Sequence, residues 1–279
     1  NYPFIIHIGF FNKNLSWGKL IFNVGNLGNE GGPMKWRILE LEEMDPHFAL
    51  ALEEIAQRSV GEGGDPIIRF WKWKERAVTV GSFQNVEDEV YTKRCKEQGI
   101  PIIRRISGGG TMYHEPEKEF IFSIIAPPGI LSRDIRESYR QVLGPIKDGL
   151  KRIGIDSVIE DNNLMVDGRK LSGSSQRRGA KAIINHGTLL YDADQDTMLR
   201  YIRGDKVIPS GKGTCSQYRP VTSVLENVNV SFDEVYQGIK EALIERKEHH
   251  IYNWTDGEIN EAEELVRTKY RDDKWNMKI

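Results

Sequence analysis

Apolar residues recur along this chain with two spacings, one typical of a helix and the other typical of a strand. Helical spacing brings Phe48, Leu52 and Ile55 to one face, directly after Asp45 and Pro46, an acid and a proline of the kinds that begin helices. The same criteria predict helices over residues 46–59, 87–99, 135–153, 233–247 and 258–270.

Short runs rich in branched and aromatic residues lie between these helices and predict strands. Asp167-Gly168 is a two-residue hairpin signal that joins two of them. The predicted strands cover residues 67–73, 77–81, 101–107, 119–126, 162–166, 169–175 and 181–191. Helices and strands that alternate in this way predict an α/β or α+β domain built around a mixed β-sheet.

The first 33 residues follow neither spacing, and a regular pattern begins only at Met34. We interpret residues 1–33 as a leader outside the fold that results from a start codon assigned too early. Glu30-Gly31-Gly32 supports this, because a purine-rich ribosome-binding sequence would be translated in this way. A genuine N-terminal extension that packs on the domain is the alternative. The domain itself is expected to span residues 34–279.

Composition narrows the range of functions. Of the 279 residues, 39% are hydrophobic and 29% charged, with a formal net charge of -2, which predicts one sizeable core and argues against a broad surface for nucleic acid or membranes. No apolar run reaches membrane-spanning length. The two cysteines, Cys95 and Cys215, lack the spacing of a disulfide framework or zinc site. We expect a cytoplasmic protein in which Cys95 is a buried apolar side chain.

Three consecutive glycines, Gly108 to Gly110, follow Arg104 and Arg105 and are the first candidate for chemistry. The stretch has neither the GxGxxG spacing of a dinucleotide site nor the GK[ST] ending of a P-loop. A bulge or tight turn between strands is the structural alternative. Because side chains alternate across a strand, one arginine is expected to face an anion beside the glycine amides while the other faces away.

Lys170 is the second candidate. It follows the predicted hairpin turn, between Gly168 and Gly173, with Asn162 and Asn163 on the partner strand. An ammonium group here can contact a carboxylate and an α-phosphate, and one such contact at about 4 Å in an effective dielectric of about 20 is worth about 4 kcal/mol before desolvation. A solvated lysine after a turn is the alternative.

Together these stretches resemble the lipoate-protein ligases, with the related octanoyltransferases and biotin ligases. "RRISGGGTMYHE" resembles the family motif RRxSGGGxVxHD, "GRKLSGSS" resembles GxKxSGxA, and "HGTLL" occurs as the family has it. "DPHFALALEE", "VTVGSFQN" and "KYRDDKWNM" extend the resemblance from Met34 to the end of the chain. It implies the class II biotinyl/lipoyl protein ligase fold, a mixed sheet flanked by helices.

The resemblance implies an ATP-dependent ligase that activates lipoate to lipoyl-AMP. The lipoyl group would then pass to a lysine of a lipoyl domain of a 2-oxoacid dehydrogenase complex, or of the glycine-cleavage carrier protein. Mg²⁺ is expected with ATP, but its ligands stay unassigned because the family's Asn-Asp pair is Asn162-Asn163 here. We expect the chain to lack the C-terminal accessory domain of longer ligases, so that either a separate small accessory protein is a further partner or the enzyme performs only one half of the reaction.

The resemblance also assigns site residues. Lys170 is implied to be catalytic, because it would neutralise the oxygens of the mixed anhydride as charge develops. The glycines are expected to let the thin acyl tail lie against bare backbone. A satisfied strand histidine is the structural alternative for His186. The residues implied to bind the lipoyl group and the adenylate are Gly81, Gln84, Asn85, Arg104, Arg105, Ser107, Gly108, Gly109, Gly110, His114, Asn162, Asn163, Gly173, His186, Gly187 and Thr188.

Two other functions stay open. An octanoyltransferase would carry the acyl group as a cysteine thioester, and Cys215 is the candidate nucleophile because it lies close to where one octanoyltransferase type keeps its own. Lys212 or Lys170 would then have to lower the pKa of Cys215. A one-residue offset from that position in a strand would turn the thiol to the opposite face, which favours the ligase. A lipoate-binding scaffold is the third function.

Overall fold

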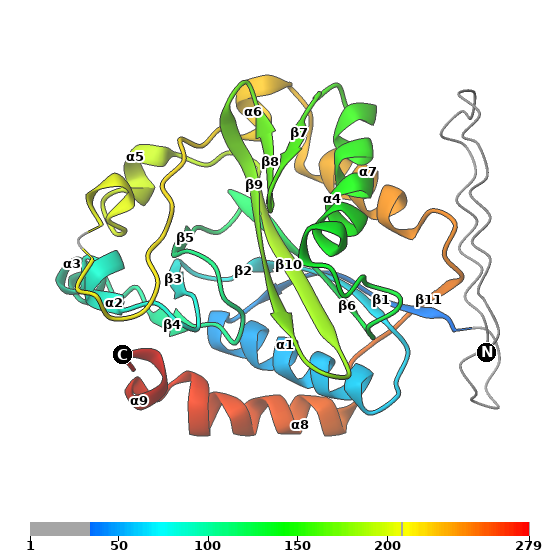
Figure 1. The fold of residues 1–279 in the computed structure, drawn as a ribbon, viewed down its shortest axis with the longest axis horizontal. Helices are drawn as coiled ribbons and strands as arrows, with labels where there is room; N and C mark the ends of the chain where they lie inside the picture. Colours follow the sequence, from blue (N-terminus) through cyan, green and yellow to red (C-terminus); the bar gives the residue numbers. More distant parts are fainter. Residues whose placement is uncertain (1–33, 208, 279) are drawn as a thin grey trace, which may run out of the picture. The chain divides into compact units, whose positions relative to one another are not determined.

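An eight-stranded mixed sheet forms the centre of the fold, in the order β11-β1-β2-β6-β10-β9-β8-β7 (Figure 1). β1 pairs in parallel with β2 and β11, and the remaining neighbours pair antiparallel. The computed structural model describes residues 34–207 and 209–278. The strands of this sheet are β1 (Trp36–Met44), β2 (Ile67–Trp73), β6 (Glu119–Ala126), β7 (Val158–Glu160), β8 (Asn163–Val166), β9 (Arg169–Arg178), β10 (Ile183–Leu190) and β11 (His249–Ile251).

A second, three-stranded sheet has the order β4-β3-β5. Its strands are β3 (Ala77–Val80), β4 (Ile102–Arg104) and β5 (Met112–His114). β3 pairs in parallel with β4 and antiparallel with β5. The three glycines lie in the connection between β4 and β5, so this small sheet positions them.

Side chains that cap helix N-termini explain where several helices begin. Asp45 accepts hydrogen bonds from the amides of His47 and Phe48, and Ser231 and Glu234 form a reciprocal capping box. The helices are α1 (Pro46–Gly61), α2 (Val86–Glu89), α3 (Thr92–Glu97), α4 (Ile135–Arg152), α5 (Gln195–Met198), α6 (Val224–Asn227), α7 (Phe232–Ile244), α8 (Asp256–Leu265) and α9 (Asp273–Asn276), with a 3₁₀ turn at Gly204–Lys206 and a π turn at Val266–Tyr270.

Strand β6 shows how the core is divided. Phe120 and Phe122 pack with the apolar faces of α4 and α7, whereas Ile121 and Ile125 pack with α1 on the other face of the sheet. Because both faces are covered, the strand is a continuous apolar run without polar alternation. The helices thus bury the sheet from both sides, and the predicted mixed sheet with flanking helices is confirmed.

The predicted helix over residues 87–99 is wrong in one respect. It is divided into α2 and α3, because Val90 forms an antiparallel bridge with Ile202 and the amide of Tyr91 donates to the carbonyl of Tyr201 at 2.8 Å. Cys95 is fully buried, as predicted. The Asp167-Gly168 hairpin is also confirmed, with both residues at positive φ between β8 and β9.

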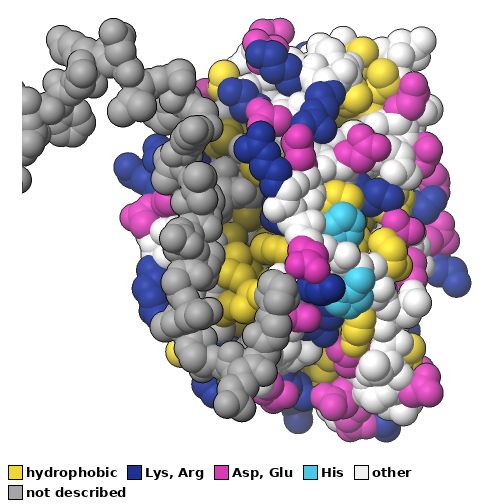
Figure 2. Space-filling model, turned by 90° about the vertical axis from the view of Figure 1, so that its right-hand side faces the viewer, with side chains coloured by type: hydrophobic (Ala, Val, Ile, Leu, Met, Phe, Trp, Pro, Cys, Tyr) yellow, Lys and Arg dark blue, Asp and Glu magenta, His cyan; other side chains and the backbone are white. Residues whose placement is uncertain are grey.

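Surface charge and helix apolarity complete the description. Basic and acidic side chains are interspersed over the described part of the face in Figure 2. No helix in residues 34–207 and 209–278 has both the length and the apolar character needed to cross a membrane. The prediction that residues 1–33 are a leader lies outside the described residues.

Candidate active site

A cavity of about 490 Å³ opens between the β4-β5 connection, the β9-β10 pair and the loop after residue 213. Its volume lies in the range of about 300–1,000 Å³ that is typical of small-molecule sites. Its wall combines apolar side chains, among them Trp71 and Trp73, with polar ones, and the exposed ring of Phe83 also lines it. The predicted site residues that line it are Arg105, Gly109, Gly110, His114, Asn162, Asn163, Lys170, Gly173, His186, Gly187, Thr188 and Cys215.

The two adjacent arginines face opposite ways, as predicted. Arg104 is fully buried away from the cavity and donates to five backbone carbonyl oxygens, those of Gly81, Gln84, Trp275, Asn276 and Lys278. Arg105 faces the cavity, and its guanidinium donates to the carbonyl oxygens of Gly108 and Gly110 at 3.1 and 2.8 Å. Burial, followed by the charge of Arg104, lowers the pKa of Arg105 to about 10. Arg104 therefore holds the C-terminal segment, and Arg105 holds the glycine loop.

At several positions around the cavity, neighbouring protein atoms leave no room for a side chain, so glycine is needed there. A Cβ on Gly81 would lie 2.1 Å from the carbonyl oxygen of Gly109, and a Cβ on Gly109, whose φ is +88°, would lie 2.9 Å from Cβ of Ser175. A Cβ on Gly110 would lie 3.0 Å from Oγ of Ser216. Among the described residues, the amides of Gly109 and Gly110 donate to no acceptor, so they are available to an anionic or carbonyl oxygen.

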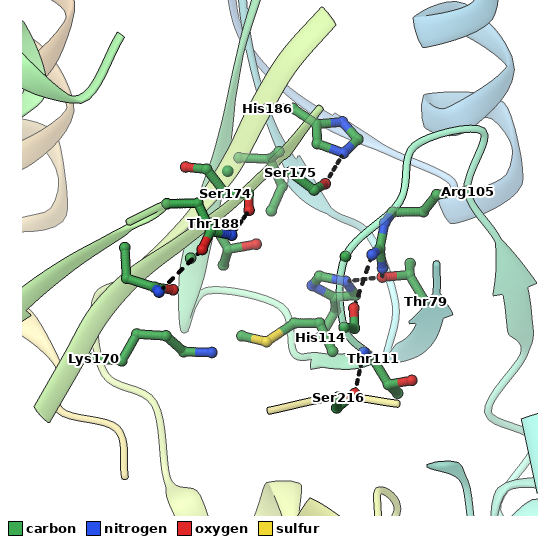
Figure 3. Close-up of a pocket in the computed structure, with 18 of the residues that line it drawn as sticks. Thr79, Arg105, Thr111, His114, Lys170, Ser174, Ser175, His186, Thr188 and Ser216 are labelled. Carbon is green, nitrogen blue, oxygen red and sulfur yellow. Dashed lines mark hydrogen bonds between the residues drawn. The ribbon is translucent and has the colours of Figure 1, made fainter. Parts of the chain in front are cut away.

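Lys170 points into the open space between β9 and the side chains of Thr111 and His114 (Figure 3). Its ammonium has no hydrogen-bond acceptor or carboxylate partner among the residues that the structure describes. Burial, and then the charge of Arg219, lowers the pKa of Lys170. A half-buried ammonium without a partner is costly, so it indicates a site for an anionic or polarised oxygen.

Two histidines of the cavity wall are each fixed by a buried carboxylate. His114 contacts Glu119 at 2.5 Å and Thr79 Oγ1 at 2.8 Å, and burial raises the pKa of Glu119. His186 contacts Glu53 at 3.0 Å. His186 is therefore a strand histidine with hydrogen-bond partners inside the protein, as the structural alternative predicted, and it also lines the cavity.

Cys215 lies in a loop, so the expectation that a one-residue offset in a strand turns its thiol away is wrong. Its exposed thiol lines the cavity. The expected neighbouring cation does not govern its pKa: partial desolvation, followed by the charges of Glu89 and Asp88, raises it. Those acids also position the loop, since Glu89 accepts from the amide of Ser216 at 2.7 Å and Asp88 accepts from Ser210.

Several predicted residues lie beside the cavity and do not line it. Gln84 bridges two loops, because its side chain accepts from the amide of Gly81 and donates to Ser216 Oγ. Asn85 donates to Asp88 and Ser210. The predicted site residues outside the cavity wall are Gly81, Gln84, Asn85, Arg104, Ser107 and Gly108.

Sequence reasoning missed several residues of this site. Glu53 lies in a buried helix face, and Trp71 and Trp73 lie on a strand without polar alternation, so no pattern indicated which way they point. Ser175 was visible only as a serine where the GxKxSGxA motif has alanine. In residues 34–207 and 209–278, no group of three or more His, Cys, Asp or Glu side chains is arranged to hold a metal ion.

The fold and this cavity define an α/β protein with a partly apolar small-molecule site, and comparison with known proteins identifies the family. Residues 45–244 match the lipoyl protein ligase A/B catalytic domain, and the chain belongs to that family. It is 29% identical to the octanoyltransferase LipM of Staphylococcus aureus, over 86% of this chain and 97% of the relative.

Solved structures agree with the family assignment. A bipartite lipoate protein ligase from Thermoplasma acidophilum, described with its E2 lipoyl domain, is 28% identical with a TM-score of 0.75 and covers 88% of this chain and 97% of that one. A lipoate-protein ligase A bound with ATP is also 28% identical with a TM-score of 0.75, covering 88% and 99%. The predicted class II biotinyl/lipoyl ligase fold is thereby confirmed.

Proposed function

We propose that this chain transfers an octanoyl group from a thioester donor to a lysine of a lipoyl domain. One observation carries the proposal: the ammonium of Lys170, which has no partner in residues 34–207 and 209–278, and the thiol of Cys215 line the same partly apolar cavity. An eight-carbon tail needs an apolar wall, which Trp71, Trp73 and Ile121 supply, and a reacting carbonyl needs a positive charge. The octanoyltransferase name of the S. aureus relative supports this choice of acyl group.

The chemistry proceeds in two steps in this proposal. Sγ of Cys215 bonds to the acyl carbon, the bond to the donor sulfur breaks, and the donor leaves as a thiol with the proton that Cys215 gives up. The acceptor lysine nitrogen then attacks the same carbon, the bond between that carbon and Sγ of Cys215 breaks as the amide forms, and Cys215 regains the proton that the amine gives up. Lys170 stabilises the oxyanion in both steps, together with the amides of Gly109 and Gly110.

ATP-dependent ligation of lipoate or octanoate is the second candidate, and the raised pKa of Cys215 favours it because a protonated thiol is a poor nucleophile. In this route the acyl carboxylate attacks the α-phosphorus of ATP, pyrophosphate leaves, and the acceptor amine then displaces AMP. Lys170, Arg219 and Asn163 line the part of the wall that suits a phosphate. The ATP-bound ligase of similar fold supports the same route.

Intact-protein mass spectrometry separates the two routes. The protein is incubated with octanoyl-pantetheine or octanoyl carrier protein without ATP, and an added octanoyl mass is expected on the wild type and lost in Cys215→Ser. Because Cys95 is fully buried, Cys95→Ala is the matched control and should keep the adduct. No adduct, together with ATP-dependent modification of a lipoyl domain that survives in Cys215→Ser, would replace the transferase proposal by the ligase.

A further inference from the structure

A second potential nucleophile lies in the cavity wall, apart from Cys215. Oγ of Ser175 lies 2.8 Å from Nε2 of His186, and Nδ1 of His186 lies 3.0 Å from Oε2 of Glu53 (Figure 3 shows the serine and the histidine). A hydroxyl, an imidazole and a carboxylate joined in this order have the arrangement that activates serine in acyl transfer.

The carboxylate fixes the tautomer of the imidazole. Burial opposes ionisation of Glu53, but its hydrogen bond with His186 and the charge of Arg69, 3.6 Å away, outweigh burial and lower the pKa of Glu53. An ionised carboxylate accepts the Nδ1 proton, which leaves the lone pair of Nε2 free to accept a proton from a hydroxyl. His186 is therefore oriented as a base toward Ser175.

Two serines compete for Nε2, and only one is open to a substrate. Ser107 Oγ also lies 2.8 Å from Nε2 of His186, but Ser107 is 0% exposed and does not line the cavity. Ser175 lines it. Ser107 Oγ lies 3.2 Å from Ser175 Oγ, so it can support the Ser175 hydroxyl from behind.

The glycine loop lies where an oxyanion would form. A Cβ built on Gly109 would stand 2.9 Å from Cβ and 3.7 Å from Oγ of Ser175, so the loop backbone packs directly on the serine. The amides of Gly109 and Gly110 have no acceptor among the described residues. Backbone amides beside a reacting carbonyl are the usual donors to a developing oxyanion.

We propose that Ser175 is a nucleophile, activated by His186 and Glu53, that gives this chain a hydrolytic activity toward activated medium-chain acyl esters and thioesters. Oγ bonds to the acyl carbon as its proton passes to Nε2 of His186, and the leaving alcohol or thiol takes that proton. Water then attacks the acyl-serine with His186 as base, the carboxylic acid leaves, and Ser175 regains its proton. The proposal needs neither ATP nor Cys215.

A fluorophosphonate probe and hydrolysis of p-nitrophenyl octanoate test this proposal. Peptide mapping of the wild type is expected to place the phosphonyl group on Ser175. Ser175→Ala should abolish labelling and lower hydrolysis about a hundredfold or more, because it removes the nucleophile that His186 activates. Alanine is the residue that the GxKxSGxA motif has at this position, so the variant is expected to fold, which thermal unfolding checks.

Ser172→Ala is the matched control. Ser172 lies on the same strand, is fully buried, and does not line the cavity, so hydrolysis and labelling should persist. A wild-type label on any other residue, or hydrolysis that survives in folded Ser175→Ala, would overturn the proposal. Transfer to a lipoyl domain is measured in parallel, because loss of the serine label with transfer intact leaves the proposed function standing.

Discussion

Replacing Lys170 by methionine removes one positive charge from the cavity wall and keeps a side chain of similar length. A unit charge about 4 Å from a developing oxyanion is worth about 4 kcal/mol at an effective dielectric of about 20. Lys170 is only half-buried, so solvent screening reduces this value. Loss of one preorganised donor usually costs about 2.7–4 kcal/mol, and we expect Lys170→Met to lower turnover by about 100- to 1,000-fold.

Stability should change in the opposite sense to activity. The folded-state pKa of Lys170 lies below its ordinary value, so folding disfavours the charged form, and at neutral pH this charge costs stability. Lys170→Met should therefore not lower the free energy of unfolding in urea. This pairing distinguishes a functional lysine from a structural one.

Single-turnover transfer of octanoyl to a purified lipoyl domain is the assay for Lys170→Met. It is run with a thioester donor and again with ATP plus octanoate, since Lys170 is proposed to act in both routes. Lys93→Met is the matched control because the Lys93 side chain is 90% exposed on α3. A folded Lys170→Met protein that retains turnover within about twofold of wild type in both assays would refute the reasoning, because it leaves less than about 0.5 kcal/mol for the charge.

Three further predictions concern stability and are measured by urea unfolding. Arg104→Lys should lower the free energy of unfolding by about 3 kcal/mol or more, because several buried carbonyl groups lose their donor at about 1–3 kcal/mol each. The control Arg58→Lys, at an exposed position, should leave the free energy of unfolding nearly unchanged. Asp45→Ala should cost about 1 kcal/mol at pH 7. Hydrogen bonding from His47 lowers the pKa of Asp45 to about 2, so this difference should disappear as the pH falls from 3.8 to about 2. A chain that starts at Met34 should unfold at the same midpoint as the full chain, and a clear drop would contradict a leader outside the fold.

Local signals in the sequence were sufficient for most elements. The Asp45 cap, the Ser231–Glu234 capping box and the Asp167-Gly168 hairpin each depend on residues a few positions apart, and all three form. The break between α2 and α3 was not predictable, because it depends on Val90 pairing with Ile202 more than a hundred positions away.

The sequence motifs predicted which residues form the site better than they predicted what each residue does. Lys170, Arg105 and His186 belong to separate motifs, and all three line one cavity. Which arginine faces it could not be read from the sequence, because the answer depends on the C-terminal carbonyls that hold Arg104. The need for glycine in the loop likewise depends on residues, such as Ser175, that are distant in sequence and close in space.

Substitution of single glycines by alanine tests why the chain needs three of them. Among the described residues, a Cβ on Gly108 would have only Phe83 Cδ2 within 4 Å, at 3.9 Å, and Gly108 does not line the cavity. We therefore expect Gly108→Ala to fold normally and to keep turnover within about twofold, as for substitutions away from close packing. In Gly109→Ala, the alanine would have to adopt a φ of +88°, and its Cβ would lie 2.9 Å from Cβ of Ser175. It should displace the loop amides and lower turnover more than about tenfold, since oxyanion donors must be placed closely.

A different explanation of the glycines predicts that Gly108→Ala and Gly109→Ala impair the enzyme equally. If the acyl tail lies along the whole bare backbone, as the motif suggests, an added methyl at Gly108 would meet the tail. Gly108→Ala would then raise KM for the octanoyl donor as strongly as Gly109→Ala, with the unfolding midpoint unchanged. Steady-state kinetics of the two variants with octanoyl and butyryl donors distinguish the two explanations. A steric clash with the tail raises KM only for the longer octanoyl donor, whereas displaced amides slow turnover of both donors equally.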